Sequence, residues 1–480
     1  RIYVQGQEAQ AIQGENKAKA DIADAEALLA TKEAAALQKG EVAKRQADVE
    51  IQKAQNLAEQ ERLNAEEVVR KEIEKRKIEI SAEAQAEKIK AIIGQDRLYE
   101  ITGLPPGFIY TLCKLLWLKE NEPQVYARTR TWLNTADSFA YRLCGQVATD
   151  YSLASRMLAM DIRGRQWSQT LIEGVGLDLD IFAPLQDSGT PLGGIRHEIA
   201  VELGLPDHTF VSVGGHDHLC GAMAIGVTEP GNMLLSIGTA AGILVPTAEP
   251  ITEPAAGRKG FEMGAHVTSG YYGMPSYRTA GVCIDWFRDT FAADADYATL
   301  IAEAESSPVG ALGVRFLPHM RLPHSPYNDA KSRGAFLGLS TDVTRGNMFR
   351  AVLEGLAFEV RSTVEPFLGE AGIAQLHAIK AIGGGTRNRI LIEMIAAVLK
   401  QRIDIVEVAE VTALGAAMLG GLGAGIYADV PSAQAQLDYS LRPVAPHMMA
   451  GALYDAIYSQ VYSQIYAALR PLNHANFDLK

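Results

Sequence analysis

The sequence lacks the features of a zinc-stabilised, membrane-spanning or nucleic-acid-binding protein. Its four cysteines, Cys113, Cys144, Cys220 and Cys283, are far apart and form no CxxC or CxxH cluster, which argues against a structural zinc site. No apolar run approaches the roughly 20 residues of a transmembrane helix, and no signal peptide is recognisable. The net charge of −12 over 480 residues provides no basic surface for nucleic acid. We therefore expect a cytoplasmic protein of two or three domains.

Proline is absent from residues 1–94, and Tyr3 is the only aromatic residue among them. Alanine, glutamate, lysine and glutamine, which all favour helices, dominate this segment. Val42 and Val49 are one heptad apart, but the heptad is broken elsewhere, which predicts a long α-helix or an irregular coiled coil. Mixed charges exclude a polybasic membrane patch. Because the chain starts at Arg1 within this pattern, we expect it to be a fragment of a longer reading frame.

Three stretches of this segment resemble the long helical region of flotillin-type proteins. The resemblance implies a homo-oligomer that forms through the helix. The membrane-apposed domain that precedes the helix in those proteins has no counterpart here. The stretches are ENKAKADIADAEALLATKEA, GEVAKRQADVEIQKAQ and LNAEEVVRKEIEKRKIEISAEAQAEK.

After Gly94 the composition becomes that of an α/β globular protein, with frequent glycines and all four tryptophans. Short apolar runs predict strands at residues 210–213, 233–237, 243–245, 378–382 and 403–408. Apolar residues at helical spacing predict helices at 348–367 and 390–399. We place domain boundaries so that residues 95–229 form a first domain and residues 230–480 a second.

Asp217 is the first candidate for chemistry, because it follows a strand and the Gly214-Gly215 pair. Glycines remove side-chain bulk, so a bound hydroxyl could approach this carboxylate and lose its proton to it. The other interpretation is a loop aspartate that caps the next helix. His216 and His218 alternate sides of an extended chain, so we expect no metal site around Asp217.

Two glycine turns follow strands and could hold phosphates or a nucleotide. Ser236–Ala240 joins two strands, as in a phosphate loop or an ordinary hairpin. Gly383–Asn388 joins a strand to a helix, as in a ligand-binding junction or a plain tight turn. The Gly383–Asn388 turn lacks the GxGxxG motif of dinucleotide-binding folds, and no acidic residue follows about twenty residues later. These two absences exclude a dinucleotide site. The small residues of 413–425 indicate close helix packing.

Asp187-Ser188-Gly189-Thr190 has the form of the DxGT phosphate loop of actin-like kinases. That loop joins two strands at the beginning of its fold, whereas this tetrapeptide lies in mid-chain between FAPLQ and PLGGI without a hairpin pattern. We interpret it as a surface turn.

Together, the motifs after residue 97 resemble the FGGY family of carbohydrate kinases. The resemblance implies two actin-like, ribonuclease-H-like domains that close on a sugar and Mg-ATP. It implies that Asp217 is the catalytic base and that Gly238 and Thr239 bind the phosphates. It also implies that Gly281, Gly384 and Asn388 bind the nucleotide. The matching segments are LYEITGLPPG, NTADSFAYRLCGQVATDYSLASR, GGHDHLCGA, SIGTA, TAGVCIDWFRD, RGAFLGLS, RAVLEGLAFEVR and GGGTRN.

One departure from the family concerns its first strands. Members begin with a hairpin that carries a DxGT loop, and here the flotillin-like helix takes its place. We expect a truncated first domain and impaired phosphorylation of a sugar or polyol. As the substrate we choose a ketopentose such as xylulose. His319 and His324 could touch the substrate or be solvated loop residues. A non-catalytic oligomeric scaffold and an artificial fusion of two reading frames remain alternatives.

Overall fold

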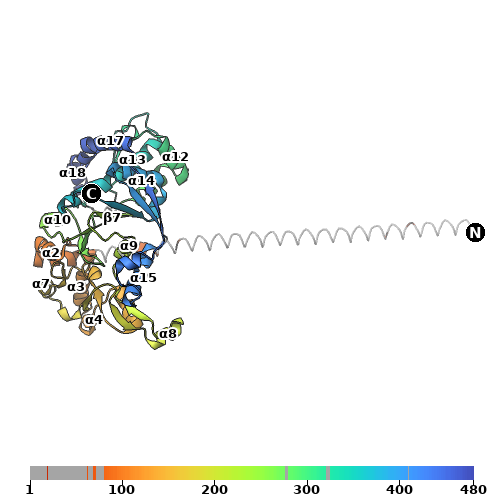
Figure 1. Ribbon diagram of the computed structural model, residues 1–480. Coiled ribbons are helices and arrows are strands. Elements are labelled where there is room, and N and C mark those ends of the chain that lie inside the picture. Colours follow the sequence, from red (N-terminus) through yellow and green to blue (C-terminus); the bar gives the residue numbers. More distant parts are fainter. Residues whose placement is uncertain are drawn as a thin grey trace, which may run out of the picture. The chain divides into compact units, whose positions relative to one another are not determined.

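The computed structural model describes residues 80–480 apart from 276–278, 321–324, 409 and 480, together with residues 14, 19, 62, 67 and 69–71. The chain divides into two compact units, Arg1–Ile80 and Ser81–Lys480. The long helix or coiled coil predicted for 1–94 lies almost entirely outside the described residues, although residues 80–93 are helical. The second unit has the α/β architecture predicted from the sequence (Figure 1).

A seven-stranded sheet forms the centre of the C-terminal part, in the order β15-β14-β13-β7-β8-β10-β9. β13 runs parallel to β7 and β14, and the other neighbouring strands are antiparallel. The strands predicted at 233–237, 378–382 and 403–408 are present as β7, β13 and β14. The bounds are β7 Asn232–Ile237, β8 Ala241–Thr247, β9 Met263–Ala265, β10 Tyr271–Gly273, β13 Ala378–Ile382, β14 Ile403–Glu407 and β15 Ser440–Val444.

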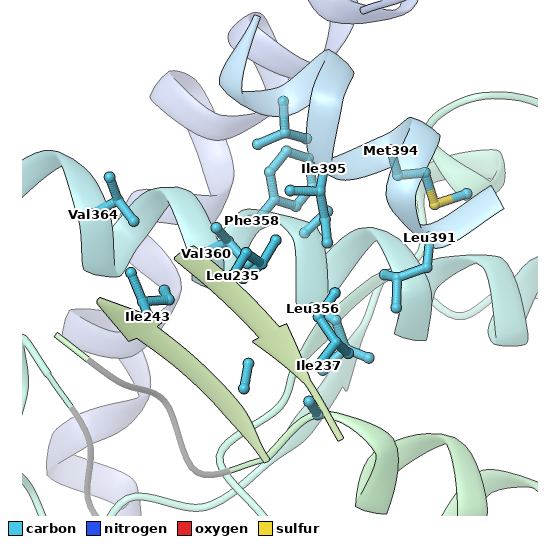
Figure 2. Packing of buried hydrophobic residues seen from close by; sticks show 14 of the residues in the cluster. Leu235, Ile237, Ile243, Leu356, Phe358, Val360, Val364, Leu391, Met394 and Ile395 are labelled. Atoms are coloured by element: carbon cyan, nitrogen blue, oxygen red, sulfur yellow. The ribbon is translucent and has the colours of Figure 1, made fainter. Parts of the chain in front are cut away.

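One face of this sheet packs against helices α13 (Arg345–Glu370) and α14 (Arg389–Leu399). Leu235 and Ile237 of β7 belong to one buried cluster with Leu356 and Ile395 of these helices (Figure 2). Each such side chain, when fully buried, stabilises the fold by about 1.5–3 kcal/mol. This cluster holds the ends of β7 and β8 in place.

The other face packs against α9 (Asp217–Ala224) and α15 (Val411–Gly423). Leu234, which alternates with Leu235 along β7, joins a cluster with Met223 of α9 and Met418 of α15. A Cβ on Gly415 would lie 2.0 Å from the carbonyl oxygen of Cys220. The small residues of α15 therefore allow the close helix packing that the sequence predicts.

The N-terminal part of the second unit is mainly helical. Its strands form three pairs in the described structure: β1 with β4 in parallel, β2 with β3 antiparallel, and β5 with β6 antiparallel. The helical residues 81–93 pack onto this part, since Ile89 is fully buried in its core. The bounds are α2 Gln95–Thr102, α3 Thr111–Asn121, α4 Pro123–Arg128, α5 Thr135–Cys144, α6 Tyr151–Ala154, α7 Gln169–Gly174, α8 His197–Leu203, β1 Thr149–Asp150, β2 Met160–Asp161, β3 Gln166–Trp167, β4 Leu185–Gln186, β5 Pro191–Gly194 and β6 Phe210–Ser212.

A buried ion pair joins the two parts of the second unit. The guanidinium of Arg156 lies 2.6 Å from Glu262 Oε2, and both side chains are largely buried. Nearby, the backbone N–H of Ala265 donates to Ser155 Oγ at 3.1 Å. Strand β9 and the residue before it are therefore fixed to the residues that follow α6.

The remaining elements surround the sheet and its connections. Within the described residues, no helix is both long and apolar enough to cross a membrane. The bounds are α10 Pro254–Arg258, α11 Gly281–Phe291, α12 Tyr297–Ser306, β11 Arg315–Leu317, β12 Ala335–Leu337, α16 Val430–Gln434, α17 Met448–Ile457 and α18 Ser463–Asp478.

Candidate active site

The turn between β7 and β8 contains the predicted phosphate-binding residues Gly238 and Thr239. The N–H of Gly238 donates to the carbonyl of Ala240 at 2.9 Å, which closes the turn. The N–H of Gly281 donates to the carbonyl of Gly238 at 3.0 Å, and the N–H of Val282 donates to that of Thr239 at 3.2 Å. The first turn of α11 is thus docked directly on the predicted phosphate loop.

Gly281 has no room for a side chain. A Cβ there would lie 2.7 Å from the carbonyl oxygen of Gly238 and 3.4 Å from Thr239 Cα. The glycine therefore permits the contact between α11 and the turn, whatever ligand the turn holds.

Gly281→Ala is expected to displace the Gly238–Thr239 turn, because the added methyl group meets backbone atoms. We expect the free energy of unfolding to fall by about 1–3 kcal/mol, as in other overpacked sites. Urea denaturation of the wild type and the variant measures this loss. Gly369→Ala is the control, because a Cβ at Gly369 has no neighbour within 4 Å. Equal stability of Gly281→Ala and the wild type would contradict the assigned packing.

Gly383–Gly385 lies beside the same end of β7. Gly383 has a φ of 94°, a conformation that favours glycine, and a Cβ on Gly385 would lie 2.2 Å from Ile237 Cγ2. Gly384 faces open space, because a Cβ there would have no neighbour within 4 Å. The structure thus brings Gly238, Thr239, Gly281 and Gly384 together around the end of β7.

Asn388 caps the helix that follows this glycine turn. Its Oδ1 accepts a hydrogen bond from the N–H of Leu391 at 3.2 Å, at the first turn of α14. This satisfies one of the unpaired donors at the helix N-terminus. Its contact with a nucleotide remains a prediction.

Asp217 is the first residue of α9, and its side chain is 67% exposed. The preceding backbone is held by a hydrogen bond from the N–H of His216 to Ser152 Oγ at 2.8 Å. Gly215 is packed closely, because a Cβ there would lie 2.5 Å from Val267 Cγ1. Within the described part of the chain, Asp217 makes no hydrogen bond or ion pair with the Gly238–Thr239 turn.

The neighbouring histidines set the charge of Asp217. A hydrogen bond with the His218 side chain and the nearby His216 ring hold the pKa of Asp217 well below its usual range. The same hydrogen bond raises the pKa of His218, whereas burial lowers the pKa of His216 to about 4. Asp217 is therefore ionised throughout the neutral pH range, and its histidine neighbours stabilise that form.

The expectation that His216 and His218 lie on opposite sides of Asp217 is wrong. Their rings are stacked with centroids 5.6 Å apart, and both Nδ1 atoms approach Asp217 Oδ1, at 3.2 and 3.1 Å. The physical reason is the backbone: alternation requires an extended strand, but α9 begins at Asp217.

The DSGT tetrapeptide at 187–190 forms a turn, as predicted. The N–H of Gly189 donates to the carbonyl of Val213 at 2.8 Å, and Ser188 Oγ donates to the buried carboxylate of Asp150 at 2.8 Å. Asp187 and Ser188 also border a cavity of about 820 Å³, together with Arg165 and the loop at Thr268–Tyr271. The two hydrogen bonds anchor the turn to the N-terminal part of the second unit.

His319 is buried, which contradicts its interpretation as a solvated loop residue, whereas its contact with a substrate stays a prediction. Its Nδ1 lies 2.6 Å from Ser332 Oγ, and its ring packs near those of Tyr327 and Tyr466. His324 lies outside the described residues.

Ser152 and Arg156 were not predicted as site residues, but they support the site from the N-terminal part of the second unit. Ser152 positions the backbone of His216, and Arg156 pairs with Glu262 across the domains. The only local signal for them was the segment TDYSLASR, since their partners are 64 and 106 residues away.

The fold and the glycine turns around β7 define a two-domain α/β protein of the sugar-kinase class. Two models of one family match the chain: the N-terminal domain of the FGGY family of carbohydrate kinases at residues 79–224, and its C-terminal domain at residues 233–424. The chain belongs to the FGGY family of carbohydrate kinases. The match begins at residue 79, within the segment to which the sequence analysis assigned the flotillin-like helix.

Characterised relatives and solved structures agree with this assignment. The chain is 32% identical to xylulose kinase of Bacillus subtilis over 69% of its own length, and this alignment spans 65% of that enzyme, slightly less than two thirds. It is 29% identical to L-fuculokinase of Escherichia coli, with 76% of the chain and 75% of that protein covered. A xylulose kinase structure from Rhodospirillum rubrum is 27% identical, with a TM-score of 0.74 over 82% of this chain and 78% of that one.

Proposed function

We propose that the chain transfers the γ-phosphoryl group of ATP to a hydroxyl group of a sugar or polyol. One observation carries this proposal: the exposed Gly238–Thr239 turn and the exposed Gly383–Gly384 pair meet at one end of β7, where Gly281 packs against the first turn. Backbone N–H groups in glycine turns favour anions such as phosphates. The family membership supports the same assignment.

In the proposed reaction, the substrate hydroxyl oxygen forms a bond to the γ-phosphorus, and the bond from this phosphorus to the β–γ bridging oxygen breaks. The hydroxyl proton goes to the carboxylate of Asp217, and ADP leaves. The Gly238–Thr239 turn holds the phosphates, while Gly384 leaves space for the rest of the nucleotide. Catalysis of this kind depends mainly on positioning and charge stabilisation.

Mg²⁺ is proposed as a partner of the ATP phosphates, whose charge it would neutralise. In the described part of the chain, the hydrogen bonds of the Gly238–Ala240 turn are with backbone groups alone. The roles proposed for Asp217 and for the Gly238–Thr239 turn therefore do not require a metal ion bound by the turn.

A ketose is the proposed substrate, and xylulose is the first choice. This rests on the names of two relatives, a xylulose kinase and an L-fuculokinase. We also propose that turnover is low, because residues 1–78 are not matched by the family models and their composition predicts helix rather than a phosphate-binding hairpin.

A coupled assay of ADP release with D-xylulose, L-fuculose, glycerol and D-gluconate tests the reaction and its substrate. We expect weak, substrate-dependent ADP release that is largest with D-xylulose. Robust turnover would contradict the proposed impairment. ADP release that is the same with and without every sugar would contradict the kinase assignment.

We propose that the N-terminal helical segment, residues 1–94, mediates self-association, on the basis of its helix-forming composition and its resemblance to flotillin-type proteins. Sedimentation velocity of the full chain is expected to give one defined multimer. A monomer at all concentrations would contradict this proposal.

A further inference from the structure

His216, Asp217 and His218 bring three potential metal ligands together at the beginning of α9. One ring nitrogen of each histidine and a carboxylate oxygen of Asp217 all lie within 4.8 Å of one another. Asp217 Oδ1 is 3.2 Å from His216 Nδ1 and 3.1 Å from His218 Nδ1. The two imidazoles therefore approach one oxygen of the same carboxylate.

These distances match the spacing of ligands around a transition metal. Zinc–nitrogen and zinc–oxygen bonds are about 2.0–2.2 Å long, so neighbouring ligand atoms in a tetrahedral site are roughly 3.3–3.5 Å apart. Both nitrogen–oxygen distances in the triad are close to this value. A small rotation of the exposed His218 ring would bring the two nitrogens within the same coordination sphere.

His216 provides a second indication of a ligand. Its Nδ1 is buried and makes no hydrogen bond of suitable geometry, although Asp217 Oδ1 lies 3.2 Å away. Its backbone is fixed by Ser152 Oγ, so the ring is held beside Asp217 before any ion binds. A buried ring nitrogen without a hydrogen bond is costly unless it gains a partner.

Solvent can reach the cluster formed by His216, Asp217 and His218. The side chains of Asp217 and His218 are 67% and 48% exposed. An ion can therefore enter from solvent and keep water molecules in its remaining positions. Two imidazoles and one carboxylate favour Zn²⁺ or Co²⁺, whereas Mg²⁺ prefers oxygen ligands alone.

We propose that His216, Asp217 and His218 bind one divalent transition-metal ion. An ion on Asp217 occupies the carboxylate that would accept the hydroxyl proton, so it blocks phosphoryl transfer. The binding itself does not depend on the proposed function, but this block does.

Titration of the full chain with Co²⁺ tests the binding directly, because Co²⁺ held by nitrogen and oxygen ligands of a protein gives visible absorption bands. We expect bands that saturate at one ion per chain and disappear when Zn²⁺ is added. His218→Gln and Asp217→Asn are expected to weaken binding by at least about tenfold. Circular dichroism confirms that each variant is folded.

The matched control is His197→Gln. His197 and Asp207 form an exposed histidine–aspartate pair with a nitrogen–oxygen distance of 2.9 Å. We expect this variant to bind Co²⁺ like the wild type. Three results would overturn the proposal: no visible bands, equal binding by His218→Gln and the wild type, or a strong near-ultraviolet thiolate band that reports binding by a cysteine.

Product formation in the presence of Zn²⁺ separates this proposal from the proposed function. If Co²⁺ binds at the triad and Zn²⁺ stops sugar phosphorylation, both are supported. If Co²⁺ binds there but Zn²⁺ leaves phosphorylation unchanged, the metal site stands and the role of Asp217 as base fails.

Discussion

Arg350→Met is expected to lower the free energy of unfolding by about 3–5 kcal/mol, because it leaves a buried carboxylate without its cation. Glu354 is 1% exposed, and its Oε1 accepts hydrogen bonds from Arg350 Nε at 2.8 Å and from the Tyr454 hydroxyl at 3.0 Å. Arg350 also donates to the carbonyls of Ala304 and Ser307. The methionine fills most of the space but replaces none of these bonds.

Urea denaturation at neutral pH measures this loss. Arg389→Met is the control, because Arg389 and Glu393 form an ion pair with the same i,i+4 spacing on the surface, and such a pair contributes at most about 1 kcal/mol. A loss below about 1 kcal/mol in Arg350→Met would contradict the assigned role of the pair.

The loss of stability in Arg350→Met is expected to depend on pH. Burial raises the pKa of Glu354, and removal of Arg350 raises it further. A carboxyl whose folded pKa lies above its unfolded pKa destabilises the fold when it is ionised, so the destabilisation should shrink as the pH falls. Equal losses at pH 5 and pH 8 would argue against an uncompensated charge.

Asp217→Asn is expected to reduce sugar phosphorylation by about 10²–10⁴-fold, because the amide cannot accept the proton of the substrate hydroxyl. The substitution preserves the size of an exposed side chain that makes no bond with the Gly238–Thr239 turn, so nucleotide binding should remain close to that of the wild type. Quantifying the sugar phosphate formed in long incubations with ATP measures the effect even when turnover is low.

Asp207→Asn is the matched control for this experiment. Asp207 is also exposed and also lies beside a histidine, His197. Its replacement should leave product formation unchanged. Retained phosphorylation in Asp217→Asn would exclude Asp217 as the base.

Local patterns in the sequence predicted the elements that carry the site. The strand at 378–382 and the glycine turn after it are both present, because an apolar run followed by glycines is a local signal. The helix predicted at 348–367 begins earlier, at Arg345, because Thr344 and Asn347 form a capping box that the apolar spacing did not reveal.

Features that depend on distant residues could not be predicted. His319 is buried by aromatic rings that include Tyr466, which lies far along the chain, so its loop sequence gave no sign of burial. The stacking of His216 and His218 depends on the residue at which α9 begins, and helix boundaries are the least certain part of a sequence-based prediction.

The central claim is that the glycine turns around β7 bind ATP. Isothermal titration of Mg-ATP into the wild type and into Gly384→Val tests it most directly, because position 384 has space for a side chain in the free protein. We expect saturable binding of one nucleotide to the wild type and loss of binding in Gly384→Val, with no change in thermal stability. Gly369→Val, at another open position, should bind like the wild type. Absence of binding to the wild type, or equal binding to Gly384→Val, would contradict the account.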